Sequence, residues 1–400
     1  MKLRPLHSPR PVQRGVTLIE LMVALVLALL IVAAVGYVYL QGSQGFRVQD
    51  GQSRMQEDAR FIIDTVGRDV RVAGAFGCNS PRNRDPLPTG QMTTSVELLA
   101  SQPLMTPATI GTGWLMTNGN DTQDRDRYVD TQYVLRGFSP TTAATAIPLP
   151  SYVQGSSRQP GTDVLMVMRT GTDARTVLPR KLTTPATALT MDGPLSPSGG
   201  AYPVMVVSDC RQSKIIKPTV TYPAAGEALL ELANGMNRNN NAPSGGVDSE
   251  LSGFGQFGKP TVSHFEPLVY FVAAPTAVGL RPTLRRVGIA NSALNWGGWE
   301  ITGGSALIAS GVEAFNLSFV VSGDPAIAKE YTMAEMEAGS ASNWAAVTAV
   351  RLQFSLVAES DNTALTPQNT IQGGPLRTDN RLVQRYDVTL GISSRQNPRN

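Results

Sequence analysis

Two features near the start of the chain could take part in chemistry, a cleavable glycine and a carboxylate beside an apolar segment. Gly15 follows Arg14, and Glu20 lies four residues after Val16. Residues 21–40 contain no charged side chain. A carboxylate within such a segment costs about 2.5–3.5 kcal/mol on membrane insertion when it lies near the centre, and less near the edge. The sequence therefore indicates a function for Glu20.

The uncharged segment is long enough to cross a lipid bilayer, because a transmembrane helix needs about 20 apolar residues. The residues ahead of it include four basic side chains, Lys2, Arg4, Arg10 and Arg14, and Glu20 is the first acidic one. Since cationic flanks stay on the cytoplasmic side of a membrane, we expect the N-terminus in the cytoplasm and the bulk of the chain on the opposite side of the membrane. An ordinary secretory signal is cut after its apolar region, whereas Gly15 precedes it.

The run Gly15-Val16-Thr17-Leu18-Ile19-Glu20 resembles the signal of type IV prepilins, Gly-Phe-Thr-Leu-Ile-Glu. The resemblance implies that a prepilin peptidase cuts after Gly15 on the cytoplasmic side. Val16 then becomes an N-methylated first residue, and the apolar helix stays on the mature protein. Val16 stands where the family usually has Phe, although other apolar residues occur there. The alternative is a plain membrane anchor in which Glu20 has no special role.

The charge of the chain gives no support for a nucleic-acid partner. The 400 residues carry a formal charge of +3, with 34 basic and 31 acidic side chains. Removal of residues 1–15 takes away four basic side chains and no acidic one, so 30 remain against 31 and the balance becomes −1. We therefore predict no nucleic-acid partner.

The two cysteines, Cys78 and Cys210, are candidates for a disulfide. An oxidising compartment favours a bridge between them. In the chain-entropy model, a bridge that closes so long a loop stabilises the fold by about 4–5 kcal/mol. Two buried thiols are the alternative. Cysteines without nearby histidines make a poor zinc site, so we expect no metal there.

The first helix is predicted to continue beyond the apolar segment. Apolar residues recur there at steps of four and three: Met55, Ala59, Ile62, Val66, Val70 and Ala73. The charged residues between them are Arg54, Glu57, Asp58, Arg60, Asp64, Arg68, Asp69 and Arg71. This pattern predicts an amphipathic helix with a charged outer face. A helix over residues 17–73 would be about 85 Å long, and Gly42 and Gly45 favour a bend or a melted segment in its middle.

The rest of the chain is predicted to be β-rich. Residues 78–127 indicate mostly loop, with a short helix at 95–101. Runs typical of strands follow at 128–136, 163–169, 203–209, 265–273, 283–288, 311–321, 347–358 and 383–393. Several alternate between apolar and polar residues, as antiparallel strands with one wet face do, and their apolar face would cover the amphipathic helix.

Together these elements give an α+β, pilin-like fold, in which a long N-terminal helix packs on an antiparallel β-rich globular domain. We expect a leader at residues 1–15, a transmembrane or filament-core half of the helix at 16–40 and an amphipathic half at 41–74. A periplasmic β-rich globular domain would occupy residues 75–400.

Short blocks further along the chain resemble the PilW family of minor pilins. They are Cys78 after Asp69-Val70-Arg71-Val72-Ala73-Gly74, the run Ser208-Asp209-Cys210, residues 343–351 and the closing strand at 385–394. The resemblance covers most of the chain but is specific only at the N-terminus and in these blocks. It implies a minor pilin of the type IV pilus, anchored in the inner membrane and later present at the pilus tip.

The partners that this resemblance implies are the prepilin peptidase, other minor pilins and the major pilin, with a tip adhesin as a further partner. Glu20 is expected to attract the amine of Val16, or that of a neighbouring subunit's first residue. The alternative is a J-type minor pseudopilin of type II secretion, which shares the same plan.

The sequence offers little that is typical of an enzyme. His7 lies in the leader, His264 lies beside an apolar strand residue, and neither a Gly-x-Ser-x-Gly elbow nor a P-loop is present. We expect no catalytic residues, cofactor or metal. The acidic run Asp121, Asp124, Asp126 and Asp130 could hold calcium, but the EF-hand spacing is missing and two arginines compete, which favours a solvated loop. The remaining alternatives are a membrane-anchored periplasmic enzyme and a DNA-uptake protein.

Overall fold

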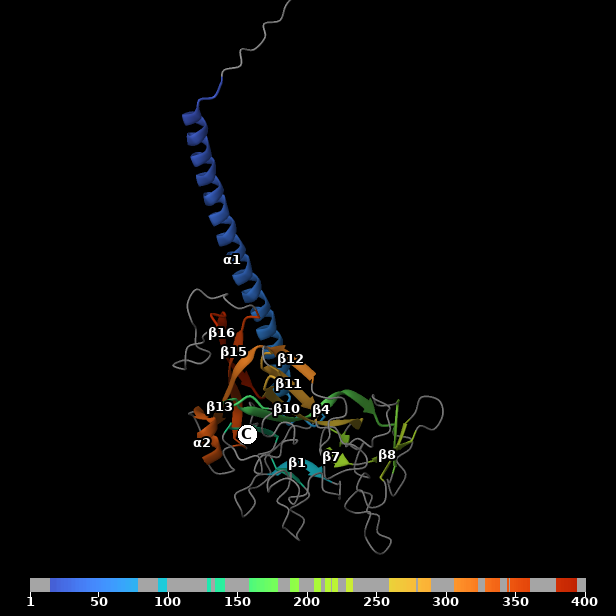
Figure 1. The fold of residues 1–400 in the computed structure, drawn as a ribbon. Helices are drawn as coiled ribbons and strands as arrows, with labels where there is room; N and C mark the ends of the chain where they lie inside the picture. Colours follow the sequence, from blue (N-terminus) through green and yellow to red (C-terminus); the bar gives the residue numbers. More distant parts are fainter. Residues whose placement is uncertain are drawn as a thin grey trace, which may run out of the picture.

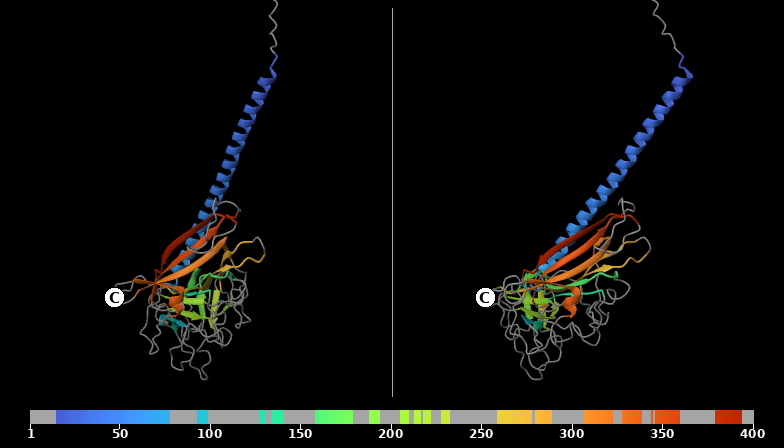
Figure 2. Two further views of the ribbon diagram at one scale, coloured as in Figure 1. Left: turned by 60° about the vertical axis from the view of Figure 1, so that its left-hand side comes forward. Right: turned by 90° about the vertical axis from the view of Figure 1, so that its left-hand side faces the viewer.

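The computed structural model describes residues 15–77, 93–98, 128–130, 134–140, 158–178, 188–193, 205–209, 213–216, 218–221, 228–232, 259–277, 280–288, 306–322, 328–338, 344, 346–359 and 379–393, and every structural statement below concerns these. One long helix, α1 (Leu18–Arg71), leads into a β-rich domain (Figure 1). Its N-terminal half stands clear of the domain in every view, and its C-terminal half lies against the strands (Figures 1 and 2). The predicted fold class, a long apolar helix joined to an antiparallel β domain, is confirmed.

Both ends of α1 follow from local sequence. Thr17 is the N-cap residue, in extended backbone, and Glu20 completes a capping box with it. At the other end Gly74 has a φ of +74°, a left-handed conformation that glycine adopts without strain and that ends the helix. On the exposed side, the Asp64 carboxylate binds Arg68 one turn later at 2.5 Å, a pairing that adds a few tenths of a kcal/mol to helix stability.

The sequence predicted a bend or a melted segment in the middle of α1, and the melted segment is wrong, because the helix is continuous through Gly42 and Gly45. Each glycine lowers helix stability by about 1 kcal/mol relative to alanine. A side-chain hydrogen bond on the same turns opposes this loss, because Gln41 Nε2 donates to the Tyr37 hydroxyl one turn earlier at 3.0 Å. Once a helix is nucleated, each further residue adds a backbone bond at little cost, so two glycines do not end it.

The strands form three sheets. The first has the order β12-β11-β10-β6-β7-β1-β2, with β4 on the other side of β10 and β3 beyond β4. Its strands are β1 (Thr93–Leu98), β2 (Tyr128–Asp130), β3 (Leu135–Phe138), β4 (Val164–Thr176), β6 (Met205–Ser208), β7 (Ser213–Ile216), β10 (Thr261–Ala273), β11 (Thr283–Gly288) and β12 (Ala306–Ser310). The second has the order β14-β13-β15-β16, formed by β14 (Ala328–Thr332), β13 (Val312–Ser322), β15 (Val347–Val357) and β16 (Val383–Gly391). The third joins β5 (Ala188–Met191), β9 (Ala228–Leu232) and β8 (Pro218–Thr221), and a short helix α2 (Met333–Ala338) follows β14.

Each predicted strand range contains a strand, although 128–136 holds β2 and the start of β3 instead of one strand, and the short helix expected at 95–101 is wrong. Its first residues belong to β1, which pairs in parallel with β7 at Val96↔Ser213. Thr93, Thr94 and Val96 are β-branched, so their stiff side chains favour a strand over a helix once a partner strand is available. The unpredicted strands have four or five residues each, too short to show a period: β5, β7, β8, β9, β12 and β14.

A single apolar core joins α1 to the two larger sheets. The stripe Met55, Ala59, Ile62, Val66, Val70 and Ala73 is buried, as the helical spacing predicts. Gly67 lets the helix approach β16 closely, because a methyl group there would lie 3.1 Å from Leu390 Cδ2. Ser393 donates its backbone N–H to the Arg71 carbonyl at 3.1 Å, which ties the end of the second sheet to the end of the helix.

Candidate functional site: the N-terminal motif and its helix

The Gly15–Val16 bond lies in non-helical chain just before α1. Gly15, Val16 and Thr17 are exposed and non-helical, and the helix begins at Leu18. Proteolysis requires an accessible segment that can adopt an extended shape, and helical residues do not offer one. The bond predicted to be cut therefore lies where a peptidase can reach it, and the apolar residues behind it are already helical.

Glu20 lies in the first turn of α1, facing back towards this bond. Its Oε2 accepts the Thr17 backbone N–H at 3.4 Å, while its own N–H donates to Thr17 Oγ1 at 3.4 Å. A carboxylate there interacts favourably with the positive end of the helix dipole. The carboxylate is thus held one residue from the nitrogen that becomes the N-terminal amine if the chain is cut after Gly15.

The helix surface beyond Glu20 is apolar on all sides and exposed. The exposed large side chains of this part are Leu21, Met22, Val23, Leu25, Val26, Leu27, Leu29, Leu30, Ile31, Val32, Val35, Tyr37, Val38, Tyr39 and Leu40. Within the described residues, α1 is the one helix whose length and composition would let it cross a membrane, and none of its apolar stretch is buried. A helix that is apolar all round requires an apolar environment, either lipid or other helices.

The prediction that Asp69 lies on the charged outer face of the helix is wrong. Asp69 is 1% exposed and lies against the first sheet. Arg169 Nη1 lies 3.3 Å from Asp69 Oδ1, and Arg286 Nη1 lies 3.5 Å from Asp69 Oδ2. Tyr270 donates its hydroxyl to the same carboxylate, and Arg169 Nη2 also pairs with Glu266 at 3.0 Å. We call these five residues the Asp69 cluster.

A signal for this position is present in the sequence. Asp69 lies three residues after Val66 and seven after Ile62, which is the spacing of one helical face. Its place inside the apolar stripe therefore indicated burial, and a buried carboxylate requires cationic partners. Those partners come from strands about 100 and 200 residues further along, so the sequence alone does not identify them.

A second buried carboxylate, Asp163, joins the two larger sheets. It lies just before β4, donates its N–H to the Phe315 carbonyl at 2.8 Å and accepts the Leu317 N–H at 2.7 Å. Burial raises the pKa of Asp163 to about 7, against the lowering effect of the Leu317 hydrogen bond. The Glu337 carboxylate raises this pKa further and Arg158 lowers it.

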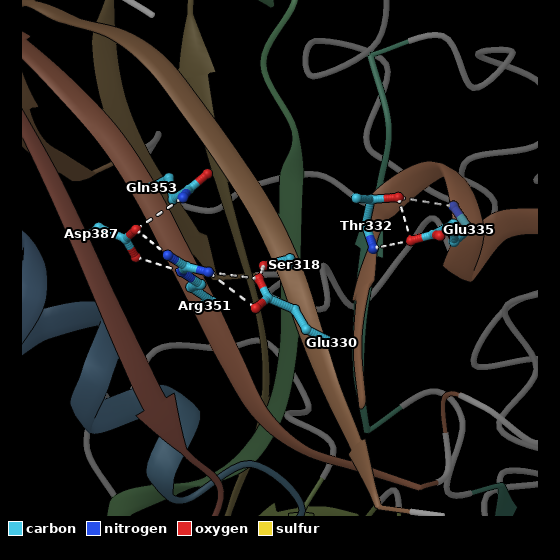
Figure 3. Close-up of polar contacts among 7 residues, drawn as sticks. All are labelled: Ser318, Glu330, Thr332, Glu335, Arg351, Gln353 and Asp387. Atoms are coloured by element: carbon cyan, nitrogen blue, oxygen red, sulfur yellow. Dashed lines mark hydrogen bonds and ion pairs between the residues drawn. The ribbon is translucent and has the colours of Figure 1, made fainter. Parts of the chain in front are cut away.

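The outer face of the second sheet carries one row of paired polar side chains (Figure 3). Arg351 on β15 binds Asp387 on β16 through two bonds of 2.7 and 2.6 Å, and Glu330 on β14 at 3.0 Å. Ser318 on β13 donates to Glu330, and Gln353 donates to Asp387 at 3.0 Å. Hydrogen bonds from Arg351 hold the pKa of Asp387 below its usual range. These side chains link all four strands of the second sheet. Their opposite charges pair with one another on the face that was predicted to be exposed to solvent.

Both cysteines lie outside the described residues, but their neighbours lie together. A methyl group on Gly77 would overlap the side chain of Ser208. Ser213 Oγ donates to the Phe76 carbonyl at 2.8 Å and lies 2.7 Å from Ser208 Oγ. The segments that lead into Cys78 and Cys210 therefore touch each other.

The acidic run at 121–130 also lies outside the described residues, apart from the backbone of β2. Within the described parts of the chain, no group of three or more His, Cys, Asp or Glu side chains is arranged to hold a metal. His264 lies half-buried in β10, in a strand that pairs with β4 and β6.

Comparisons with known proteins agree with the N-terminal features. Residues 10–36 match the prokaryotic N-terminal methylation motif, so the chain has a prepilin-like N-terminus. No curated protein matches the chain. Among solved structures, a type IV-like pilin from Thermus thermophilus matches at 15% identity, over 34% of this chain and 69% of that one, with a TM-score of 0.19. A likeness at this TM-score supports no inference about the domain.

Proposed function

We propose that the chain is a PilW-like minor pilin of the type IV pilus, which joins other minor pilins in an assembly-priming complex at the pilus tip. The observation that carries the proposal is the methylation motif over residues 10–36, which runs into an apolar helix that is exposed on all sides. A secreted or plainly anchored protein needs neither the motif nor an acidic residue at the start of its apolar helix.

The molecule has the parts that this role requires. An exposed apolar helix can pass from the inner membrane into a filament core without changing its own structure. The β domain is attached to the other half of the same helix, and would lie in the periplasm. The partners in this proposal are the prepilin peptidase, other minor pilins, the major pilin and a tip adhesin.

A deletion strain tests which filament system the protein serves. For a PilW-like minor pilin, we expect loss of surface pili and of twitching motility, while type II secretion continues. Complementation with the full chain should restore both. Normal piliation together with a secretion defect would contradict the proposal and favour the J-type pseudopilin, whose motif and helix would be the same.

We also propose a disulfide between Cys78 and Cys210. It is supported by the contact between Gly77 and Ser208, which lie one and two residues from the two cysteines. Thiol titration of the denatured, unreduced protein should find no free thiol, and two after reduction. Two thiols before reduction would contradict the bridge.

A further inference from the structure

The Asp69 cluster places four charges at the joint between α1 and the β domain. Two carboxylates and two guanidinium groups give it no net charge, and burial together with the Asp69 carboxylate raises the pKa of Tyr270, which keeps its hydroxyl a donor. The side chains of Asp69 and Arg169 are only 2% and 11% exposed. Buried ion pairs of this kind are often no more stabilising than apolar residues of the same volume. Stability alone therefore gives no reason for charges here.

The arrangement of the partners indicates another reason. Strand β10, which supplies Tyr270 and Glu266, has β4 on one side and β11 on the other. Arg169 comes from β4 and binds one carboxylate oxygen of Asp69, and Arg286 comes from β11 and binds the other. Rolling the helix in either direction would therefore lengthen one of the two ion pairs. Apolar burial by itself supplies no comparable restraint, because its driving force is non-directional.

The chain just after the helix is fixed separately. Gly74 donates its N–H to the Met168 carbonyl at 2.8 Å, and the Ala75 carbonyl accepts the Thr170 N–H at 3.3 Å. These bonds hold the end of the helix in place, and further back the Tyr386 hydroxyl donates to the Met55 carbonyl at 3.3 Å. Asp69 lies between these two points, against the first sheet, where its ion pairs act on the direction that the helix takes.

The direction of α1 matters because its exposed part is long, so that a small change of angle at the domain greatly displaces its N-terminus. At 1.5 Å per residue, the segment from Leu18 to Arg47 is about 45 Å long. A tilt of about 10° at the domain would move its N-terminus by roughly 8 Å, most of the distance between neighbouring packed helices. A subunit whose helix must enter a crowded apolar environment in one position therefore needs a joint with a fixed angle.

We propose that the Asp69 cluster fixes the orientation of α1 relative to the β domain, with Asp69 as a positioning residue held between Arg169 and Arg286. The angle of the helix is a property of the folded chain itself. The effect of this orientation on filament assembly rests on the proposed function. The orientation itself does not, so either claim can be wrong without the other.

The test is a distance measurement in the full chain in detergent. Paramagnetic labels carried on unnatural amino acids, which leave both cysteines untouched, would be placed at Gln44 on the exposed part of α1 and at Thr389 or Leu307 on the strands. Each pair gives a distribution of helix-to-domain distances by electron–electron double resonance. The first variant is Asp69→Asn, which removes the charge at almost constant volume.

A second variant replaces the whole cluster by apolar or neutral residues, so that no arginine is left without a partner: Asp69→Leu, Arg169→Met, Glu266→Gln, Tyr270→Phe and Arg286→Met. The matched control is Val66→Ala, which weakens packing on the same face of the same helix and leaves the charges intact. Thermal melting of each variant reports whether the domain is folded.

We expect both label pairs to show distributions at least twice as wide in the five-residue variant as in the original chain, although the variant still melts cooperatively. Asp69→Asn should also widen the distance distributions. Val66→Ala should lower the melting temperature without widening the distributions. Unchanged distances in a folded five-residue variant would overturn the proposal. Equal widening in Val66→Ala would overturn it too, because packing would then set the angle.

Discussion

At the scale of single residues, Glu20 has two candidate roles, as a helix cap and as a partner for a terminal amine. Thr17→Ala removes the capping box and leaves the carboxylate, so it is the matched control for Glu20→Ala. A lost cap costs about 0.5–2 kcal/mol. A terminal amine left unpaired in an apolar core costs about 3–5 kcal/mol.

We therefore predict that Glu20→Ala is processed normally but incorporated into filaments at least about tenfold less, since 1.4 kcal/mol corresponds to a factor of ten. Thr17→Ala should be incorporated nearly as well as the original chain. Immunoblots of membrane and sheared-pilus fractions measure both quantities. Normal piliation with Glu20→Ala, or an equal loss with Thr17→Ala, would remove the pairing role.

Asp163 predicts a pH dependence of folding stability. Its pKa is near 7 in the folded domain because it is buried, and about 3.9 in an unfolded chain. A folded state that holds the proton more tightly is stabilised at low pH. This contribution is fully present below about pH 4 and is lost as the pH rises through about 7, at about 1.4 kcal/mol for each unit of pKa difference.

Asp163→Asn should abolish this fall, because the amide oxygen can still accept the Leu317 N–H and has no proton to lose. Denaturant unfolding at pH 4, 5.5 and 7 measures the free energy of unfolding of the original chain and of the variant. If the difference in stability between the two chains stays constant across this range, Asp163 is already ionised in the folded domain and the predicted pKa shift is wrong.

Sequence reasoning placed the apolar stripe of α1 correctly, because its members recur at helical spacing within one element. The capping box of Thr17 and Glu20 was not predicted, although the two residues are only three positions apart. Asp69 was misplaced because charge was taken as a sign of exposure. Its burial depends on two arginines from distant strands, and only the fold brings them to the helix.

At the scale of elements, the contact between α1 and β16 depends on Gly67. A methyl group there would be 3.1 Å from Leu390 Cδ2, closer than ordinary packing allows. Gly67→Leu should therefore force the helix away from the strand and lower the free energy of unfolding by about 1–3 kcal/mol, the usual cost of overpacking. Chemical denaturation of the full chain in detergent measures the change.

Gly42→Ala is the matched control, because nothing lies within 4 Å of the added methyl group. It replaces glycine within the same helix and should raise helix stability by about 0.5–1 kcal/mol. The opposite signs of the two substitutions separate helix propensity from packing. A neutral Gly67→Leu would mean that the helix is not held close to β16.

Element by element, the sequence predicts the strands of the second sheet best. Strands β13, β15 and β16 have nine or more residues each, with one apolar and one polar face, so their period is clear. Strands of four or five residues give no such pattern, and β1 was expected to be a helix. Its pairing with β7 links residues more than 100 positions apart, which local propensity does not report.

At the scale of the whole molecule, one helix carries two kinds of surface that suit two different environments. Its first half is apolar and exposed, and its second half is amphipathic and buried against a β domain. The prepilin-like motif, residues 10–36, begins ahead of the helix and extends into its first half. If the chain is cut after Gly15, as proposed, the apolar half stays attached to the mature protein and would tether the domain until a filament takes up the helix.

The measurement that tests this account most directly is the N-terminal mass of the protein from membranes, in cells with and without the prepilin peptidase. The account predicts a mature chain that begins with methylated Val16 when the peptidase is present, and an uncut chain that retains residues 1–15 when it is absent. A mature chain cut beyond residue 40, or one that keeps residues 1–15 in both strains, would contradict it.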